Sequence, residues 1–107
     1  MKLKLYRDAA GDARARGKGR AKVLAGFLES DLQDSPASAQ EVLRAIEDTE
    51  AGRLRSWERT GNAYTLTLSP EAATLRDEMD EDFEPYVLSL SEIREAVEGW
   101  VSFLDGP

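Results

Sequence analysis

The segment Arg55–Leu68 constrains the fold more than any other part of the chain. Its last five residues, Tyr64–Leu68, alternate strictly between large apolar side chains and threonine, which is the period-two pattern of a half-buried strand. Gly61-Asn62 precedes them and predicts a hairpin turn, because Gly and Asn tolerate positive φ. A hairpin cannot bury one face alone, so further strands and helices must cover it. We expect Trp57 and Tyr64 to belong to that core.

The same segment contains a more specific pattern, formed by Ser56-Trp57, Arg59, Gly61 and Tyr64-Thr65-Leu66. It resembles the Ser-Trp-x-Arg-x-Gly-x-x-Tyr-Thr-Leu core of the YacL-like proteins, small bacterial proteins without an assigned activity. Shorter matches follow in the same order along the chain, at Arg7-Asp8 with Gly11, at Asp77-Glu78-Met79 and at Leu88-Ser89-Leu90. The resemblance spans most of the chain and implies a fold more than a chemistry.

The remaining periodicities predict the other elements of one domain that spans residues 1–107. Further strands are expected at residues 2–7, 13–16, 72–76 and 86–90. Helices are expected at residues 21–33, from a Ser38 capping box to Gly52, and from a Ser91 cap to the chain end, where Trp100 lies on the apolar face. These elements predict an α+β fold, with a mainly antiparallel sheet of about four to five strands and two to three helices packed on one face.

The chain contains no Cys and no His. Disulfides, thiolate nucleophiles, the usual zinc sites and Ser-His triads are therefore excluded. We expect no enzymatic activity, no catalytic residues, no cofactor and no metal site. No apolar run approaches the roughly 20 residues that span a bilayer, and the basic first 22 residues lack the apolar core of a signal peptide. These patterns predict a cytoplasmic protein without a membrane partner.

Charge is distributed unevenly around a net value of −7. Residues 1–22 contain eight Lys or Arg and two Asp, whereas residues 77–107 contain ten carboxylates and one Arg. Within the basic segment, Gly17–Arg20 departs from a phosphate loop in its glycine spacing and lacks the Ser or Thr after Lys18, so a flexible basic loop is the preferred interpretation. Part of the segment is also expected to pair with the acidic C-terminal third.

The run of residues 77–84 places six carboxylates in eight positions, and their mutual repulsion gives folding no reason to assemble them. Three interpretations remain open: a solvated loop, a calcium site that lacks the EF-hand pattern, and a surface that binds the cationic cleft of another protein. The candidate partner-binding residues are Asp77, Glu78, Asp80, Glu81, Asp82, Phe83 and Glu84.

Size and charge favour the last interpretation, a surface that binds the cationic cleft of another protein, and they indicate a class of protein with such a surface. Small, acidic, cysteine-free bacterial proteins of this length are similar to immunity proteins, which neutralise nuclease toxins such as those of contact-dependent growth inhibition. We expect an inhibitor that is a monomer when free and binds a basic nuclease toxin domain. The alternative is a YacL-like housekeeping protein, or a nucleic-acid or ribonucleoprotein-associated module that uses the basic N-terminal segment. Direct binding of nucleic acid is not expected at physiological salt, because the net charge repels it.

Overall fold

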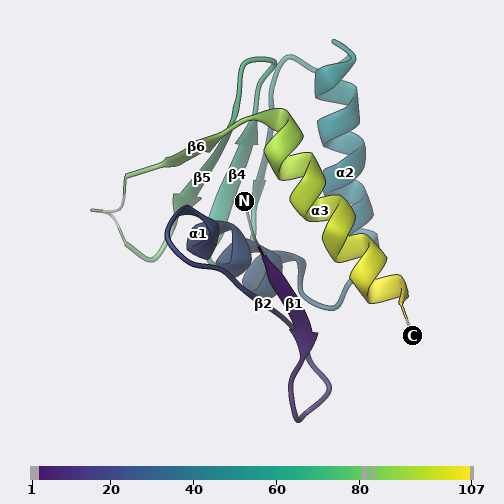
Figure 1. Cartoon of the computed structure of the whole chain (residues 1–107). Coiled ribbons are helices and arrows are strands. Elements are labelled where there is room, and N and C mark those ends of the chain that lie inside the picture. Colours follow the sequence, from purple (N-terminus) through teal and green to yellow (C-terminus); the bar gives the residue numbers. More distant parts are fainter. Residues whose placement is uncertain (1–2, 81, 83, 107) are drawn as a thin grey trace.

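The computed structural model describes residues 3–80, 82 and 84–106. The chain begins with a hairpin and a helix, continues through a second helix and four strands, and closes with a third helix (Figure 1). In chain order the elements are β1 (Lys4–Arg7), β2 (Ala13–Arg16), α1 (Arg20–Phe27), the π-helical turn η1 (Leu28–Leu32), α2 (Pro36–Glu50), β3 (Trp57–Thr60), β4 (Tyr64–Leu68), β5 (Ala73–Asp77), β6 (Tyr86–Leu88) and α3 (Leu90–Asp105).

Strands β3 to β6 form one antiparallel sheet in sequence order. Leu66 in β4 lies opposite Leu75 in β5, and Leu68 lies opposite Ala73, so that the apolar sets of neighbouring strands share one face. All four of these side chains are fully buried. The alternation read from Tyr64–Leu68 is therefore confirmed as the core face of the sheet.

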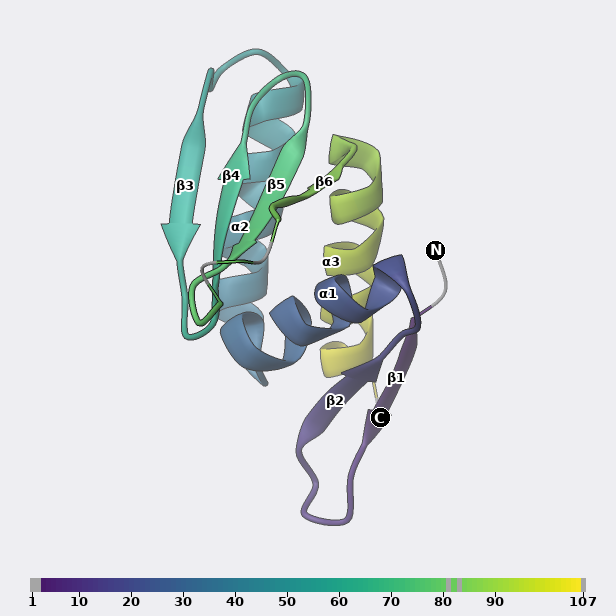
Figure 2. The ribbon, with the colours of Figure 1, turned by 90° about the vertical axis from the view of Figure 1, so that its left-hand side faces the viewer.

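Two helices cover that face. Figure 2 shows α2 behind the strands and α3 beside α2. Helix α1 crosses near the lower ends of these two helices in the same view. The buried stripe of α2 includes Val42 and Ile46, and that of α3 includes Ile93, Val97 and Trp100. The predicted α+β fold, with helices packed on one face of an antiparallel sheet, is confirmed. None of the described helices has the length and apolarity needed to cross a membrane.

The N-terminal strands do not join the central sheet. Strands β1 and β2 pair only with each other, in a separate two-stranded sheet. Ala13 and Ala15 are buried in the same core cluster as the helices, because alanine lets this hairpin approach α1 closely. The expectation of one sheet of four to five strands is thus refined to sheets of four and two strands.

Both predicted helix caps lie at the wrong serine. The side chain of Ser35 caps α2 by accepting a hydrogen bond from the Ser38 N–H at 3.2 Å, and Pro36 occupies the first helical position. Helix α3 begins at Ser89, which forms a capping box with Glu92 rather than leaving the cap to Ser91. Each observed cap lies nearer the N-terminus than the predicted one. A serine in extended conformation before the first helical turn is better placed to accept hydrogen bonds from the free N–H groups of that turn.

The predicted first helix is confirmed with an irregular second half. α1 passes into the π-helical turn η1, and Gln33 ends it with φ 53°. Gly26, which interrupts the helical pattern, has a packing reason. A side-chain carbon there would lie 2.6 Å from the hydroxyl oxygen of Tyr64, so glycine lets β4 approach α1.

The three predicted core aromatics differ in burial. Trp100 is 0% exposed and its indole Nε1 donates to the Gln33 carbonyl oxygen at 2.8 Å. Trp57 and Tyr64 are half-buried and pack against the edge of the core. Burial raises the pKa of the Tyr64 hydroxyl, with smaller contributions from Asp77 and Asp31. Only Trp100 is therefore a fully buried member of the core that all three were expected to share.

Candidate functional site

The candidate partner-binding residues lie on the connection between β5 and β6, here called the acidic loop (residues 77–84). In Figure 1 this connection projects from the end of the sheet away from the C-terminus. Of the seven candidates, Glu81 and Phe83 lie outside the described residues. The structure divides the other five into a base that is attached to the sheet and a tip that faces solvent.

Glu78 belongs to the base of the loop. Its carboxylate accepts hydrogen bonds from the Thr65 hydroxyl and from Arg76 Nε, the latter at 3.1 Å. Its N–H donates to the Ala63 carbonyl oxygen at 2.8 Å. The Thr65 hydroxyl, followed by Arg76, lowers the pKa of Glu78. This carboxylate therefore has a structural partner, and Thr65 is 1% exposed beneath it although it lies on the outer face of the sheet.

Asp77 also belongs to the base. It ends β5 as a half-buried residue opposite Tyr64. Its Oδ1 accepts the Met79 N–H at 2.8 Å, which turns the chain out of the strand. Asp77 and Glu78 thus fix where the loop leaves the sheet, and contact with a partner is not needed to explain them.

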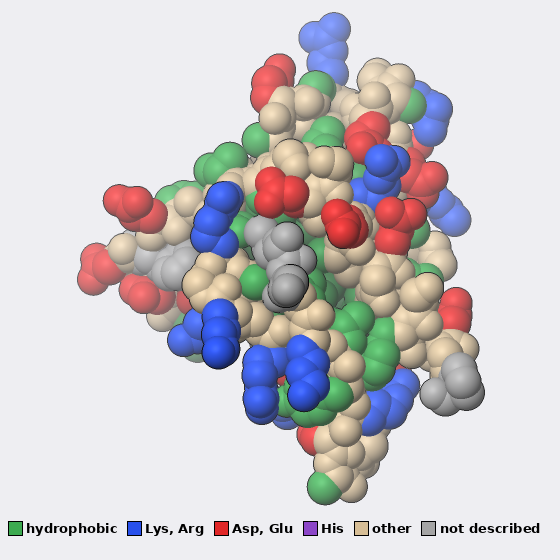
Figure 3. All heavy atoms as spheres, viewed as in Figure 1, with side chains coloured by type: hydrophobic (Ala, Val, Ile, Leu, Met, Phe, Trp, Pro, Cys, Tyr) green, Lys and Arg blue, Asp and Glu red, His purple; other side chains and the backbone are tan. Residues whose placement is uncertain are grey.

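The tip presents free carboxylates to solvent. Asp80, Asp82 and Glu84 are exposed, and Asp80 Oδ1 accepts the Asp82 N–H at 3.1 Å in a second aspartate turn. Figure 3 shows the acidic side chains gathered at the left-hand end of the molecule. Among the described residues, none of these three takes part in an ion pair. Within the described residues, the charges of these three exposed carboxylates are therefore not compensated by an ion pair.

Two exposed apolar side chains precede and follow the tip in the sequence. Met79 is 80% exposed and Val87, on β6, is 55% exposed, and they are the large hydrophobic side chains that the described part of the chain leaves in solvent. From the sequence, Phe83, Met79 and Tyr86 are the apolar anchors expected for a partner. Met79 is exposed, Tyr86 is half-buried and Phe83 lies outside the described residues. Val87 was missed, because its exposure depends on which face of β6 is covered. Exposed apolar side chains beside charged ones are a feature of protein interfaces.

Metal binding finds no support in this geometry. Over residues 3–80, 82 and 84–106, no group of three carboxylates converges into a set that would hold a metal ion. Of the described carboxylates in the acidic loop, Asp77 and Asp80 accept hydrogen bonds from the loop backbone, and Glu78 accepts them from Thr65 and Arg76. Asp82 and Glu84 are exposed.

The basic N-terminal segment was expected to pair with the acidic C-terminal third, but among the described residues no ion pair joins the two. The contacts between them include those of Arg20, which lies over the Tyr86 ring and donates to the Val87 carbonyl oxygen. The described ion pairs of the basic segment join Arg7 to Asp34 at 2.7 Å and Arg14 to Glu29 at 3.0 Å, and Arg14 also lies 3.6 Å from Asp8 on the same hairpin. The hydrogen bond from Arg7 lowers the pKa of Asp34. The bridges to Asp34 and Glu29 tie the N-terminal hairpin to the end of the first helical segment. Within the described residues, the basic segment forms no ion pair with the acidic loop.

Asp31 is a residue that sequence reasoning missed. It is buried at the end of η1, and its two carboxylate oxygens accept the N–H groups of Ala63 and Tyr64 at 2.9 and 3.1 Å. Burial raises the pKa of Asp31, and these two donors and Arg59 oppose that rise. Asp31 therefore acts as a structural clamp on the β3–β4 turn, which in turn supports the acidic loop through Ala63.

Comparison with known proteins gives a consistent family and no activity. The model of the "Uncharacterised protein family (UPF0231)" matches residues 1–98. A "UPF0231 protein" of Shewanella amazonensis is 29% identical over 88% of this chain and 88% of its own length. The "UPF0231 protein YacL" of Salmonella paratyphi B is 28% identical over 80% of this chain and 78% of its own, as is that of Salmonella newport. No solved structure matches the chain.

Proposed function

Because the chain belongs to the Uncharacterised protein family (UPF0231), whose description assigns no activity, we propose a function from its geometry. The protein is an immunity protein, a non-enzymatic inhibitor that covers the active site of a basic nuclease toxin of a contact-dependent growth inhibition system. The observation that supports this proposal is the tip of the acidic loop, where Asp80, Asp82 and Glu84 are exposed and are preceded and followed in the sequence by the exposed side chains of Met79 and Val87.

The charge of the tip suits a nuclease as partner. A nuclease cleft must be cationic to hold the phosphates of its substrate, and it therefore also attracts closely spaced carboxylates. Long-range attraction of this kind raises the rate of encounter and is screened by salt over about 10 Å at 0.1 M ionic strength. The loop would thus compete with the substrate for the same cations.

The apolar side chains would lengthen the lifetime of the complex, which charge alone does not do. Rim charges contribute little to the lifetime of a complex, whereas desolvated apolar anchors near the centre of an interface dominate it. Met79 and Val87 are positioned to be buried by a partner that receives the tip. The loop base contributes preorganisation: with Asp77 and Glu78 hydrogen-bonded in the free protein, less conformational entropy is lost on binding.

Co-expression tests the proposal. The genes beside that of this protein are first examined for a nuclease toxin. The toxin domain found there is then expressed in a sensitive host with or without this protein, and growth is measured. The same toxin domain, purified, is assayed for cleavage of its nucleic acid with an equimolar amount of the inhibitor. We expect restored growth and loss of cleavage. Growth arrest and full cleavage despite soluble expression of both chains would reject the immunity function.

A further inference from the structure

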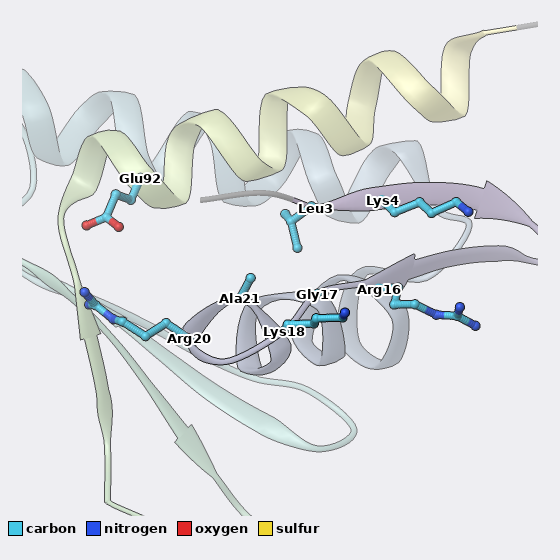
Figure 4. A pocket seen from close by; sticks show the side chains of 8 residues that line it. All are labelled: Leu3, Lys4, Arg16, Gly17, Lys18, Arg20, Ala21 and Glu92. Atoms are coloured by element: carbon cyan, nitrogen blue, oxygen red, sulfur yellow. The ribbon is translucent and has the colours of Figure 1, made fainter.

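A cavity of about 820 Å³ opens between β1, the start of α1 and the start of α3 (Figure 4). Four cations line it: Lys4 from β1, Arg16 from the end of β2, Lys18 from the following loop and Arg20 from the start of α1. The side chains of Leu3 and Ala21 lie between these cations and provide an apolar surface (Figure 4). The volume is within the range of about 300–1,000 Å³ that is typical of small-molecule sites.

The loop Gly17–Gly19 gives the cavity its shape. Sequence reasoning had treated this Gly-Lys-Gly segment as a flexible basic loop because its glycine spacing is not that of a phosphate loop. The structure instead places it between strand β2 and helix α1, with Gly19 at φ 58° directly before the first helical residue. A strand followed by a glycine-containing loop and a helix is the arrangement in which backbone and lysine side chains approach phosphate groups. The loop therefore has the context of a phosphate site without the complete motif.

Ion pairs within the described residues do not neutralise the positive charge of the cavity, although the pKa of Glu92 on its wall is lowered by hydrogen bonds from Ser89 and also by the charge of Arg20. Across the residues that the structure describes, none of its four cations forms an ion pair, and neither does the neighbouring Lys22. Arg7 and Arg14, on the same hairpin, do form ion pairs. Glu92 is the carboxylate on the cavity wall, and it already accepts the Ser89 N–H at 3.0 Å in the cap of α3. Clustering cations without counter-charges costs stability, and a bound anion would remove that cost.

Two arginine–tyrosine pairs hold opposite ends of the cavity. The guanidinium of Arg20 lies 5.3 Å from the Tyr86 ring centroid and donates to the Val87 carbonyl oxygen at 3.2 Å. The guanidinium of Arg16 lies 5.5 Å from the Tyr6 ring centroid. These contacts orient planar groups on which an organic ring can stack. Tyr86 belongs to β6, so its pairing with Arg20 could not be predicted from the sequence of the basic segment.

We propose that this cavity binds a small organic phosphate of nucleotide size with at least two phosphoryl groups. The phosphoryl oxygens would interact with Lys4, Arg16 and Lys18, and the organic part would lie on the apolar surface near Arg20. A long polynucleotide fits less well, because the net charge of −7 repels a polyanion whose ends extend beyond the cavity. A small ligand has its charge neutralised locally.

Titration with ADP, followed by proton–nitrogen correlation spectra, tests this site. We expect the amide signals of Gly17 and Gly19 to shift with a single Kd, while that of Gly52, which follows α2 and does not line the cavity, stays unchanged. Lys18→Gln should raise the Kd about 10-fold or more, as expected for loss of a charge-assisted contact. Arg44→Gln is the matched control: it removes the same charge at an exposed position away from the cavity and should leave the Kd unchanged.

Inorganic pyrophosphate, adenosine and a short single-stranded RNA complete the experiment. Pyrophosphate should compete with ADP at the same residues but bind more weakly, and adenosine should not shift these signals. A Kd for ADP above about 1 mM, or equal Kd values for wild type and Lys18→Gln, would overturn the proposal. So would equal shifts with adenosine, which would show that phosphate is not recognised. RNA that binds tighter than ADP and displaces it would assign the cavity to a polynucleotide instead.

Discussion

The carboxylate of Asp31 occupies the space in which a side chain at Gly61 would lie. A Cβ atom at Gly61 would fall 2.5 Å from Asp31 Cγ and 2.9 Å from Asp31 Cβ, although the two residues belong to different segments of the chain. The turn sequence had suggested that glycine is needed at position 61 for a positive φ. Gly61 does not have a positive φ, so that reason is wrong. Glycine is required there because the carboxylate must come close enough to bind the backbone of the β3–β4 turn.

Gly61→Ala should therefore destabilise the protein by about 1–3 kcal/mol, because the new methyl group displaces Asp31 or the turn. Urea denaturation monitored by tryptophan fluorescence measures this loss. The control is Gly99→Ala, in the middle of α3 with nothing within 4 Å of the added carbon. That change should stabilise by about 0.5–1 kcal/mol through helix propensity. Equal effects of the two substitutions would contradict the close approach.

Asp31 should also give stability an unusual dependence on pH. Burial raises its pKa above the ordinary value of 3.8, so the folded state binds this proton more readily than the unfolded chain. Stability from protonated Asp31 is fully present below pH 3.8 and is lost as pH rises through the folded pKa. The difference in unfolding free energy between wild type and Asp31→Asn should therefore decrease as pH rises through this window. Urea denaturation at a series of pH values measures it, and a difference that increases with pH would refute the assignment.

The two tryptophans should contribute unequally. Trp100→Ala is expected to cost about 3–5 kcal/mol, because it empties a fully buried site and also removes the donor to the Gln33 carbonyl oxygen. Trp57→Ala should cost clearly less, because its ring is half-buried. Chemical denaturation of both variants gives the comparison. A larger loss of unfolding free energy for Trp57→Ala than for Trp100→Ala would contradict the placement of Trp100 at the centre of the core.

The position of the α2 cap can be tested by two serine substitutions. Ser35→Ala removes the side-chain acceptor of the Ser38 N–H and should cost about 1 kcal/mol. Ser38→Ala leaves that acceptor in place and should cost only a few tenths of a kcal/mol. Thermal unfolding of both variants separates them. If Ser38→Ala is the more harmful change, the helix begins where the Ser38-x-x-Glu41 pattern had predicted.

Local patterns were sufficient to predict most of the elements. The alternation of Tyr64–Leu68 and the stripe of α3 reflect which side of one element is buried, and both are confirmed. The separation into two sheets was not predictable, because the pattern of Ala13 and Ala15 indicates a buried face without indicating its strand partner. The choice of Ser35 over Ser38 depends on backbone conformation at one residue, which composition does not determine.

The sequence was sufficient to predict which segment forms the candidate site, but not how that segment divides into a base attached to the sheet and an exposed tip. Six carboxylates in eight positions are visible in the sequence, yet the hydrogen bonds of Glu78 to Thr65 and Ala63 exist only because β4 and β5 pair in one register. The exposure of Val87 likewise follows from the sheet face that the helices cover. Whether the tip binds a toxin stays a prediction.

The rate of association with the neighbouring toxin domain tests that prediction most directly. Asp80→Asn, Asp82→Asn and Glu84→Gln together remove three charges and keep the hydrogen-bond acceptor of Asp80. The matched control removes three charges elsewhere, through Glu41→Gln, Glu47→Gln and Glu71→Gln, all of them exposed. Stopped-flow mixing at low salt should show association slowed about 10-fold or more by the loop variant and little by the control, with the difference vanishing at high salt. Equal association rates for the loop variant and the wild type would contradict binding through the acidic loop.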